Sequence, residues 1–217
     1  MTTRILIADD HAIVREGLRR ILAADAAFMV VGEAGDGHQV VTAVRAGGFD
    51  VLLLDLSMPG RSGIDLLRQV KAERPDLRVL VLSMHAEQQY AVRAIRAGAS
   101  GYLTKDAAAT QLTAALRRVA GGGLFITPAV AEALAVGLQT AGDEAPHKRL
   151  SDREYEVFLR LAAGDSVTSI AERLSLSVKT VSTHKTHILE KMNLASLADL
   201  VRYAMTHRLL DSPDVSS

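Results

Sequence analysis

The chain has 217 residues, 25 basic and 25 acidic side chains, and 48% hydrophobic residues. These values are typical of one large or two small globular domains and exclude a wholly disordered or polybasic chain. The absence of cysteine excludes disulfides, thiolate metal sites and cysteine nucleophiles. No apolar run is long enough to span a membrane, and the run before Asp9 is too short for a signal peptide, so we expect a cytoplasmic protein.

Residues 1–124 alternate short apolar runs with longer amphipathic stretches. This alternation predicts parallel βαβ units and an α/β fold with a doubly wound, five-stranded parallel sheet. The runs at 5–7 and 51–54 are apolar on both faces, as strands covered by two helix layers must be. Strands are expected at 5–8, 29–31, 51–54, 79–82 and 101–103, with helices near 12–23, 38–46, 62–73, 87–97 and 108–120.

No strand pattern appears after residue 124. Thr127 and Pro128 predict the start of a short Ala-rich helix at 128–138, and residues 139–148 have little to bury and are typical of a flexible linker. The helices expected after the linker begin at the capping box Ser151–Glu154, at 167, after Ser177 and at 197, and end near Ala163, 174, Met192 and 208. We therefore predict one domain at 1–124, a linker with a short helix at 125–147, and a smaller all-α helix-turn-helix domain at 148–210.

Polar residues follow four of the predicted strands: Asp9 and Asp10, then Asp55, Ser83 and Lys105. The carboxyl ends of parallel strands meet at one edge, where ligands bind in doubly wound folds. Converging carboxylates repel one another, and a hard cation such as Mg²⁺ relieves that repulsion. An acid, a metal, a lysine and a hydroxyl together predict phosphoryl transfer onto a carboxylate. Each residue taken alone is more typical of a turn, a cap or a solvated loop.

These motifs resemble those of a known family. The strings Ile-Ala-Asp9-Asp10-His, Leu-Leu-Asp55-Leu-Ser57-Met-Pro-Gly-x-x-Gly63, Val-Leu-Ser83 and Gly-Tyr102-Leu-x-Lys105-Asp are similar to those of the receiver domains of bacterial two-component response regulators. The resemblance covers residues 3–120 and implies a flavodoxin-like receiver fold.

The receiver resemblance also implies a role for each motif residue. Asp55 is the implied phosphoacceptor, which takes a phosphoryl group from the phosphohistidine of a sensor histidine kinase. Lys105 pairs with the phosphoryl oxygens, Ser83 and Tyr102 form the switch pair, and Pro59-Gly60 makes a tight turn over the site. The implied Mg²⁺ ligands are Asp10 directly, Asp9 through water, Asp55, and the backbone carbonyl of Ser57.

The predicted helix at 178–192 follows a tight turn and is the second helix of a helix-turn-helix, the element that enters the DNA major groove in such motifs. Its apolar stripe is expected to contain Val178, Val181, Ile188, Leu189 and Met192, and its polar face Lys179, Ser182, Thr183, Thr186 and Lys191. The pattern alone favours an ordinary solvated face, since every amphipathic surface helix has one.

The C-terminal motif string at 150–192 resembles the LuxR-type DNA-binding domain, and the whole chain resembles the NarL/FixJ subfamily of transcription regulators. That resemblance implies base contacts by Ser182, Thr183 and Thr186, and phosphate contacts by Lys179, Thr180, Lys185 and Lys191. The last helix, with Leu197, Leu200, Val201 and Ala204, resembles a dimerisation helix. His184 and His187 have helical spacing but no evident third ligand, so we do not expect a metal there.

We therefore predict a transcription regulator that is activated by phosphorylation, is not an enzyme, and has DNA, a sensor histidine kinase and a second copy of itself as partners. Three alternatives remain open. An aspartyl-phosphate hydrolase would need a second acid close to Asp55, where this chain has Ser57. A flavodoxin-like nucleotide or flavin binder would need a glycine-rich loop, which Asp9-Asp10-His11 is not. The third is a regulator that works without phosphate.

Overall fold

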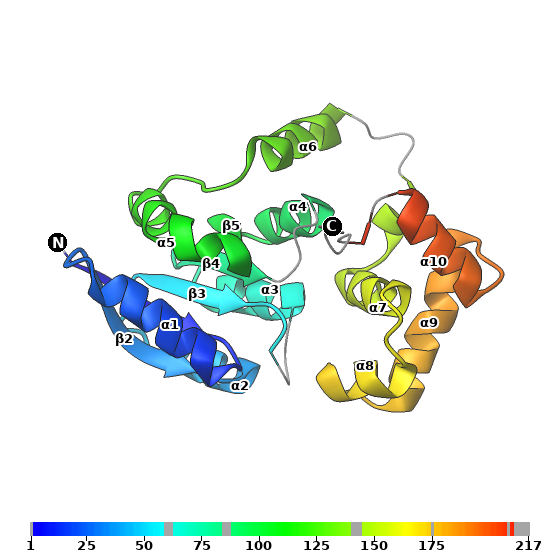
Figure 1. The fold of residues 1–217 in the computed structure, drawn as a ribbon, viewed down its shortest axis with the longest axis horizontal. Coiled ribbons are helices and arrows are strands. Elements are labelled where there is room, and N and C mark those ends of the chain that lie inside the picture. The colour runs from blue at the N-terminus through cyan, green and yellow to red at the C-terminus, as the bar shows by residue number, and fades with distance from the viewer. Residues whose placement is uncertain are drawn as a thin grey trace, which may run out of the picture. The chain divides into compact units, whose positions relative to one another are not determined.

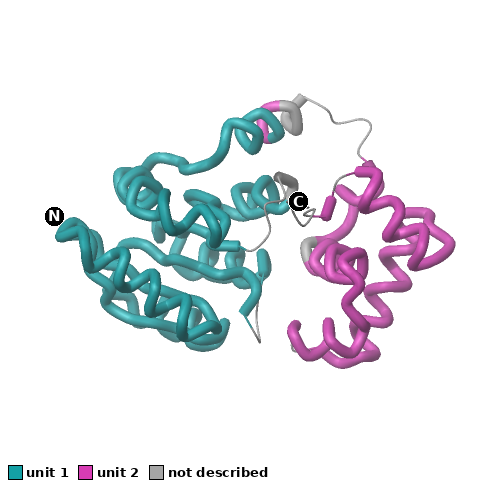
Figure 2. Tube along the Cα trace, in the orientation of Figure 1, with its two compact units in different colours: residues 1–133 teal, residues 134–217 magenta. Residues whose placement is uncertain are grey.

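The computed structural model describes residues 2–58, 63–83, 88–139, 145–174, 176–207 and 209–210. It divides into two compact units, residues 1–133 and residues 134–217 (Figure 2). The tight turn expected at Pro59-Gly60 lies outside the described residues, as do Ser175 and the tail from Asp211. No helix in the described part of the chain is long and apolar enough to cross a membrane.

The first unit is built on a five-stranded sheet. All strand pairs are parallel and the order is β2-β1-β3-β4-β5, so the predicted fold class is confirmed (Figure 1). Every residue of the central strand is buried, as its continuous apolar sequence requires. The strands are β1 (Thr3–Ala8), β2 (Phe28–Ala34), β3 (Val51–Asp55), β4 (Arg78–Ser83) and β5 (Gly101–Thr104).

The strand register decides which side chains meet. Ala8 pairs with Leu54, Asp55 with Leu82, and Ser83 with Thr104. The residues that end or follow these strands therefore gather at one edge of the sheet, the edge at which ligands bind in this architecture.

Helices cover both faces of the sheet. One face carries α1 (Ala12–Ala23) and α5 (Lys105–Ala120), whose buried Leu18, Leu22 and Leu116 pack on Ile5 and Ile7 of β1. The helices α2 (Gly37–Ala46), α3 (Gly63–Glu73) and α4 (Gln88–Arg96) pack in series, α2 against α3 and α3 against α4 (Figure 1). Alternate strand residues point to opposite faces, so a strand buried on both sides needs both layers.

Helix α5 begins at Lys105, three residues before the predicted start at 108. Thr104 is its N-cap, with a side-chain oxygen that accepts a hydrogen bond from the backbone N–H of Ala107 at 3.3 Å. Asp106 in the first turn favours the same start, because an acidic side chain there complements the helix dipole. Lys105 is thus held by the first turn of a helix and does not lie on a free loop.

All elements of the second unit in the described residues are helical. Its elements are the end of α6 (Pro128–Gln139), a 3-10 turn η1 (Pro146–Arg149), α7 (Asp152–Ala162), α8 (Val167–Arg173), α9 (Val178–Met192) and α10 (Leu197–Thr206). Helix α7 packs against α9 and α10, and α8 packs against α9. The core at these contacts contains the buried side chains of Tyr155, Phe158, Ile170, Val181, Ile188 and Leu200.

Local signals in the sequence set the helix ends of this unit. The capping box of Ser151 and Glu154 is present at the start of α7, and Ser177 caps α9 through the backbone N–H of Thr180. Asn193 ends α9 in the left-handed region at φ 54°, which Asn tolerates better than most residues.

The segment expected to be a flexible linker differs from that expectation at its end. His147 in η1 is buried, and its Nδ1 lies 2.6 Å from the hydroxyl of Tyr203 on α10. The ring of His147 also meets Tyr203 edge-on, with centroids 5.6 Å apart. Local composition cannot predict a hydrogen bond to a distant helix. The sequence therefore predicts a flexible linker here, although His147 is fixed.

Candidate functional site

Three carboxylates and one lysine meet at the carboxyl edge of the sheet, and we call Asp9, Asp10, Asp55 and Lys105 the acidic site. Asp9 and Asp55 are completely buried, and Asp10 is partly exposed. One donor atom from each of Asp9, Asp10, His11 and Asp55 lies within 4.8 Å of the others. The structure therefore brings Asp55 next to Asp9, although 46 positions separate them in the sequence.

Lys105 is the cation of the acidic site. Its Nζ donates to Oδ2 of Asp55 at 2.8 Å and lies 2.7 Å from Oδ2 of Asp9. Its side chain is only 12% exposed, so this ion pair is largely shielded from water. Three carboxylates against one ammonium leave a formal charge of −2, which a divalent cation balances.

The surroundings change the pKa values of the buried pair. Burial raises the pKa of Asp55, and the nearby charge and hydrogen bond of Lys105 oppose that rise only in part. Burial by itself lowers the pKa of Lys105, but Asp55 and Asp9 together outweigh burial and raise it. The lysine is thus held in its charged form, while the Asp55 carboxylate is costly to keep charged without a further cation.

The other oxygens of the acidic site differ in how far hydrogen bonds satisfy them. The backbone N–H of Ser57 donates to Oδ1 of Asp55 at 3.0 Å, and that of His11 donates to Oδ1 of Asp9 at 2.8 Å. Oδ1 of Asp10 is buried and accepts no hydrogen bond, although the ring of His11 is near. An oxygen-rich, net negative pocket with such an atom fits a hard divalent cation.

The predicted switch residues lie on the neighbouring strands. Ser83 is the last residue of β4 and is completely buried, and Tyr102 on β5 is 6% exposed. The Tyr102 ring is therefore turned into the unit, and its backbone N–H donates to the carbonyl of Phe125 at 3.0 Å.

Two residues near the acidic site were given no role from the sequence. Nδ1 of His11 lies 2.8 Å from Oδ1 of Asp10. Nη1 of Arg15 donates to the backbone carbonyl of Asp9 at 2.7 Å, and its Nε donates to Glu33 of β2 at 2.8 Å. His11 is the N-cap of α1 but makes no capping hydrogen bond, and a histidine at a cap position is the signal that could have drawn attention to it.

Helix α9 exposes one polar face. The residues Lys179, Ser182, Thr183 and Thr186 are exposed at helical spacing, whereas Val181, Ile188 and Met192 are buried. Thr180 and Lys185 are partly buried at the margins of this face. Val178 was expected in the apolar stripe, but it is 49% exposed, because it belongs to the first turn of the helix, beyond the core.

Lys191 is 46% exposed but forms an ion pair with a buried residue of the same unit. Its Nζ donates to both carboxylate oxygens of Glu154, at 2.8 and 2.7 Å. Glu154 also closes the capping box by accepting from the backbone N–H of Ser151 at 2.8 Å. Lys191 thus ties the end of α9 to the start of α7, a role that the sequence pattern does not reveal because 37 residues separate the partners.

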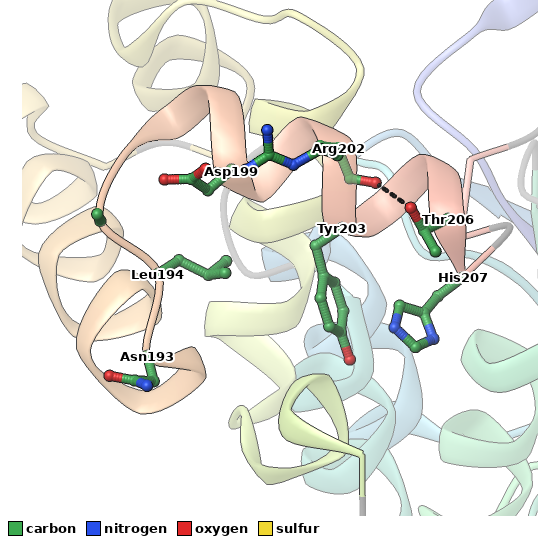
Figure 3. A pocket seen from close by; sticks show the side chains of 8 residues that line it. Asn193, Leu194, Asp199, Arg202, Tyr203, Thr206 and His207 are labelled. Carbon is green, nitrogen blue, oxygen red and sulfur yellow. Dashed lines mark hydrogen bonds and ion pairs between the residues drawn. The ribbon is translucent and has the colours of Figure 1, made fainter.

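Helix α10 has one buried and one exposed side. Leu200 and Ala204 are completely buried in the unit, whereas Leu197 and Met205 are 37% and 66% exposed. Figure 3 shows a pocket along α10 in which Tyr203 and His207 lie together, with ring centroids 4.2 Å apart. Thr206 donates to the carbonyl of Arg202 in the same helix at 2.9 Å (Figure 3). The pocket is lined by Asn193, Leu194, Ala195, Asp199, Arg202, Tyr203, Thr206 and His207.

Comparison with known proteins identifies both units. Residues 5–117 match the response regulator receiver domain, and residues 148–204 match the bacterial regulatory proteins of the luxR family. The chain is 40% identical over 215 residues to the oxygen regulatory protein NreC of Staphylococcus carnosus, covering 96% of this chain and 99% of NreC. It is 35% identical over 214 residues to the response regulator UvrY of Escherichia coli K12, covering 98% of each.

A solved structure shows the same architecture. The chain resembles RcsB of Salmonella enterica serovar Typhimurium, which was solved bound to the promoter P1flhDC with the phosphomimetic BeF3−. The TM-score is 0.68 with 31% identity over 95% of this chain and all of that one. The family matches span both units, and the relatives match over nearly their full length. The chain therefore belongs to the two-component response regulators of the NarL/FixJ type, transcription regulators with a receiver domain and a LuxR-type DNA-binding domain.

Proposed function

We propose that Asp55 is the phosphoacceptor of this regulator and that its phosphorylation controls DNA binding by the second unit. The observation that supports this most strongly is the buried contact of Asp55 with Lys105, at the edge of the sheet where Asp9 and Asp10 also lie. A buried carboxylate beside a fixed cation is positioned to form a bond to phosphorus while the charge of the incoming group is neutralised.

In the proposed reaction, an oxygen of Asp55 attacks the phosphorus of a phosphohistidine on a sensor kinase. The new O–P bond forms as the P–N bond breaks, and the electron pair of that bond leaves with the histidine nitrogen. Lys105 stays charged because the carboxylates raise its pKa, so it can pair with the phosphoryl oxygens. The product is an aspartyl phosphate, and no water or redox partner is consumed.

The residues of the acidic site also fit the Mg²⁺ that receiver domains generally bind. Asp10, Asp9, Asp55 and the backbone carbonyl of Ser57 would hold the ion, and its formal charge would balance the site. When bound, Mg²⁺ supplies charge neutralisation for the transferring phosphoryl group. The chain's own contribution is to hold Asp9 and Asp55 in place through Lys105, Ser57 and Arg15.

The signal would pass through Ser83 and Tyr102. A phosphoryl group on Asp55 adds strong hydrogen-bond acceptors at the end of β3, next to the end of β4 where Ser83 lies. We propose that the Ser83 hydroxyl moves toward this group and that the buried state of Tyr102 is stabilised in consequence. A change of this kind alters the surface beside β4 and β5 without refolding the sheet.

DNA recognition is proposed for the exposed face of α9. The RcsB relative was solved bound to promoter DNA, and the exposed Lys179, Ser182, Thr183 and Thr186 lie on one side of the second helix of the helix-turn-helix. Lysine suits phosphates and small hydroxyls suit base edges. The partly buried Thr180 and Lys185 are further candidates for phosphate contacts. Lys191 is a weaker candidate, because releasing it would break its ion pair with Glu154.

We also propose that the phosphorylated protein acts as a homodimer in the cytoplasm, where a kinase and chromosomal DNA are both available. Two-fold symmetry matches the paired half-sites that helix-turn-helix dimers read. The exposed apolar Leu197 and Met205 make α10 the candidate dimer helix, whereas Leu200 and Ala204 are already used in the core.

The test is DNA binding by the full chain with and without phosphorylation. We expect a small-molecule phosphodonor with Mg²⁺ to strengthen binding to a regulated promoter, measured by fluorescence anisotropy. Asp55→Asn should remove this gain while leaving the weak basal binding intact. An equal gain with Asp55→Asn would contradict the proposal, because the phosphoryl group would then act elsewhere.

A further inference from the structure

His11 follows the two acids after β1 and is the N-cap residue of α1, but its side chain does not cap the helix. Residues at the N-cap normally accept a hydrogen bond from the first turn, but His11 makes none. Its backbone N–H donates to Oδ1 of Asp9 at 2.8 Å, and its ring lies beside the carboxylates of Asp9 and Asp10. The stability of α1 therefore does not explain the position of this ring.

The ring nitrogen lies within the group of carboxylate oxygens. Nδ1 is 2.8 Å from Oδ1 of Asp10 and 3.4 Å from Oδ1 of Asp9. The contact with Asp10 is at ion-pair distance, so a ring proton can be shared with that carboxylate. A metal ion can take the place of this proton, because imidazole nitrogen and carboxylate oxygen are both metal ligands.

These separations lie on both sides of those in a small transition-metal site. A tetrahedral Zn²⁺ with bonds of about 2.0–2.1 Å has ligand atoms roughly 3.4 Å apart. In the structure, the four donor atoms from Asp9, Asp10, His11 and Asp55 all lie within 4.8 Å of one another. To complete the set, the 2.8 Å pair of Nδ1 and Asp10 Oδ1 opens slightly and the longer separations close. The ring is 63% exposed, so it is free to adjust.

Lys105 does not block this arrangement at Asp9. The lysine lies 2.7 Å from Oδ2 of Asp9, whereas the ring and backbone of His11 approach Oδ1 of the same carboxylate. The ammonium and an ion bound near His11 would thus occupy opposite oxygens. Both charges are needed in a site that otherwise carries three carboxylates.

We propose that His11 gives the acidic site a second binding mode, in which Nδ1 joins the three carboxylates around a divalent transition-metal ion such as Zn²⁺. Mg²⁺ prefers oxygen ligands and does not need the imidazole, whereas imidazole suits Zn²⁺. Four protein ligands close the coordination sphere, so this mode excludes Mg²⁺ and uses the Asp55 oxygen needed for phosphorylation. His11 thereby makes the receiver sensitive to inhibition by Zn²⁺. The inference rests on the proposed phosphoacceptor site.

The first experiment measures the Zn²⁺ affinity of the metal-free, untagged full chain by competition with a chromogenic chelator. Changing an outer-sphere partner of a metal ligand costs about 10–100-fold in affinity, so we expect His11→Ala, which removes a ligand itself, to weaken Zn²⁺ binding by about 100-fold or more. The Mg²⁺ affinity should stay unchanged. His38→Ala, which removes an exposed histidine of α2, is the matched control and should leave Zn²⁺ affinity unchanged.

A rescue variant separates ligation from a merely structural role. His11→Cys should restore much of the Zn²⁺ affinity because a thiolate is also a good Zn²⁺ ligand. An equal Zn²⁺ affinity in wild type and His11→Ala would overturn the proposal. So would an equal loss of Mg²⁺ and Zn²⁺ affinity in His11→Ala, which would mean that His11 only shapes the acid pair.

The second readout is phosphorylation in Mg²⁺ with increasing Zn²⁺. We expect Zn²⁺ to inhibit labelling of the wild type at concentrations about 100-fold lower than for His11→Ala, matching the affinity difference. Equal inhibition of both would overturn the inhibitory mode. If Mg²⁺-dependent labelling persists in Asp55→Asn, the proposed phosphoacceptor fails instead, so the two failures are distinguishable.

Discussion

The acidic site and the exposed face of α9 differ in how the protein holds their charges. At the acidic site, Asp9 and Asp55 are completely buried and Lys105 is fixed against both. On α9, Lys179, Thr183 and Thr186 are exposed, and the hydroxyls of the two threonines donate to carbonyls of their own helix. Buried charges must be compensated within the molecule, whereas exposed ones are compensated by water.

Because of this difference, the acidic site points to a function by itself, whereas the exposed face of α9 does not. Burying carboxylates and a lysine costs desolvation free energy. Such an arrangement therefore indicates a functional site. An exposed helix face is compatible with water alone, and its partner becomes evident only through relatives such as the DNA-bound RcsB. The same comparison predicts large effects from changes at the acidic site and small ones on α9.

The largest effect is expected for Lys105→Met in the absence of divalent metal. Removing the cation leaves two buried carboxylates without their partner. This should lower the free energy of unfolding of the first unit by about 3–5 kcal/mol. Hydrogen exchange in β3 and β4 of the full chain should accelerate accordingly, and Mg²⁺ should reverse part of the change by replacing the lost charge. Lys105→Arg keeps the charge and is the control. No change in exchange would show that the ion pair contributes little to the unit.

A smaller effect is expected for Glu154→Gln, which keeps the capping geometry but removes the charge. Losing the charge-assisted hydrogen bonds from Lys191 should cost about 1–3 kcal/mol of the free energy of unfolding of the second unit at neutral pH. Although burial raises the pKa of Glu154, the hydrogen bonds from Lys191 and Ser151 lower it overall.

The pH dependence of that loss has a definite sign. A carboxyl whose pKa is lowered by folding stabilises the native state above its ordinary pKa, and the contribution is lost as pH falls through the folded value. The wild type and Glu154→Gln should therefore differ at neutral pH and converge in acid, measured by urea unfolding monitored through helix content. A difference that persists at pH values well below the lowered pKa of Glu154 would contradict the assigned cause.

The smallest effect is expected for Lys179→Ala on α9. Because the side chain is exposed, folding stability should be unchanged, and DNA affinity should fall to a similar extent for every sequence. The slope of log affinity against log salt should decrease by about one. Lys191→Ala should instead destabilise the unit, because Lys191 is bound to Glu154. If both variants showed the same change in salt slope and no loss of stability, both lysines would contact DNA phosphates. That outcome would contradict the role assigned to Lys191.

Much of the fold follows from the sequence, for physical reasons. The buried runs at 51–54 and 79–82 predict central strands because only such strands are apolar on both faces, and Ser151 and Ser177 mark helix starts through their own capping bonds. The convergence of Asp9, Asp55 and Lys105 follows once the sheet is parallel. Pairs that depend on tertiary packing do not follow, as with Lys191 and Glu154 or His147 and Tyr203.

The central claim is that one phosphoryl group enters at Asp55, and locating that group tests it most directly. The full chain is incubated with a small-molecule phosphodonor and Mg²⁺, and the modified residue is located by fragmentation mass spectrometry. The account predicts one phosphoryl group on the peptide that contains Asp55, absent when Mg²⁺ is chelated. A phosphoryl group on any other residue, or undiminished uptake in Asp55→Asn, would contradict it.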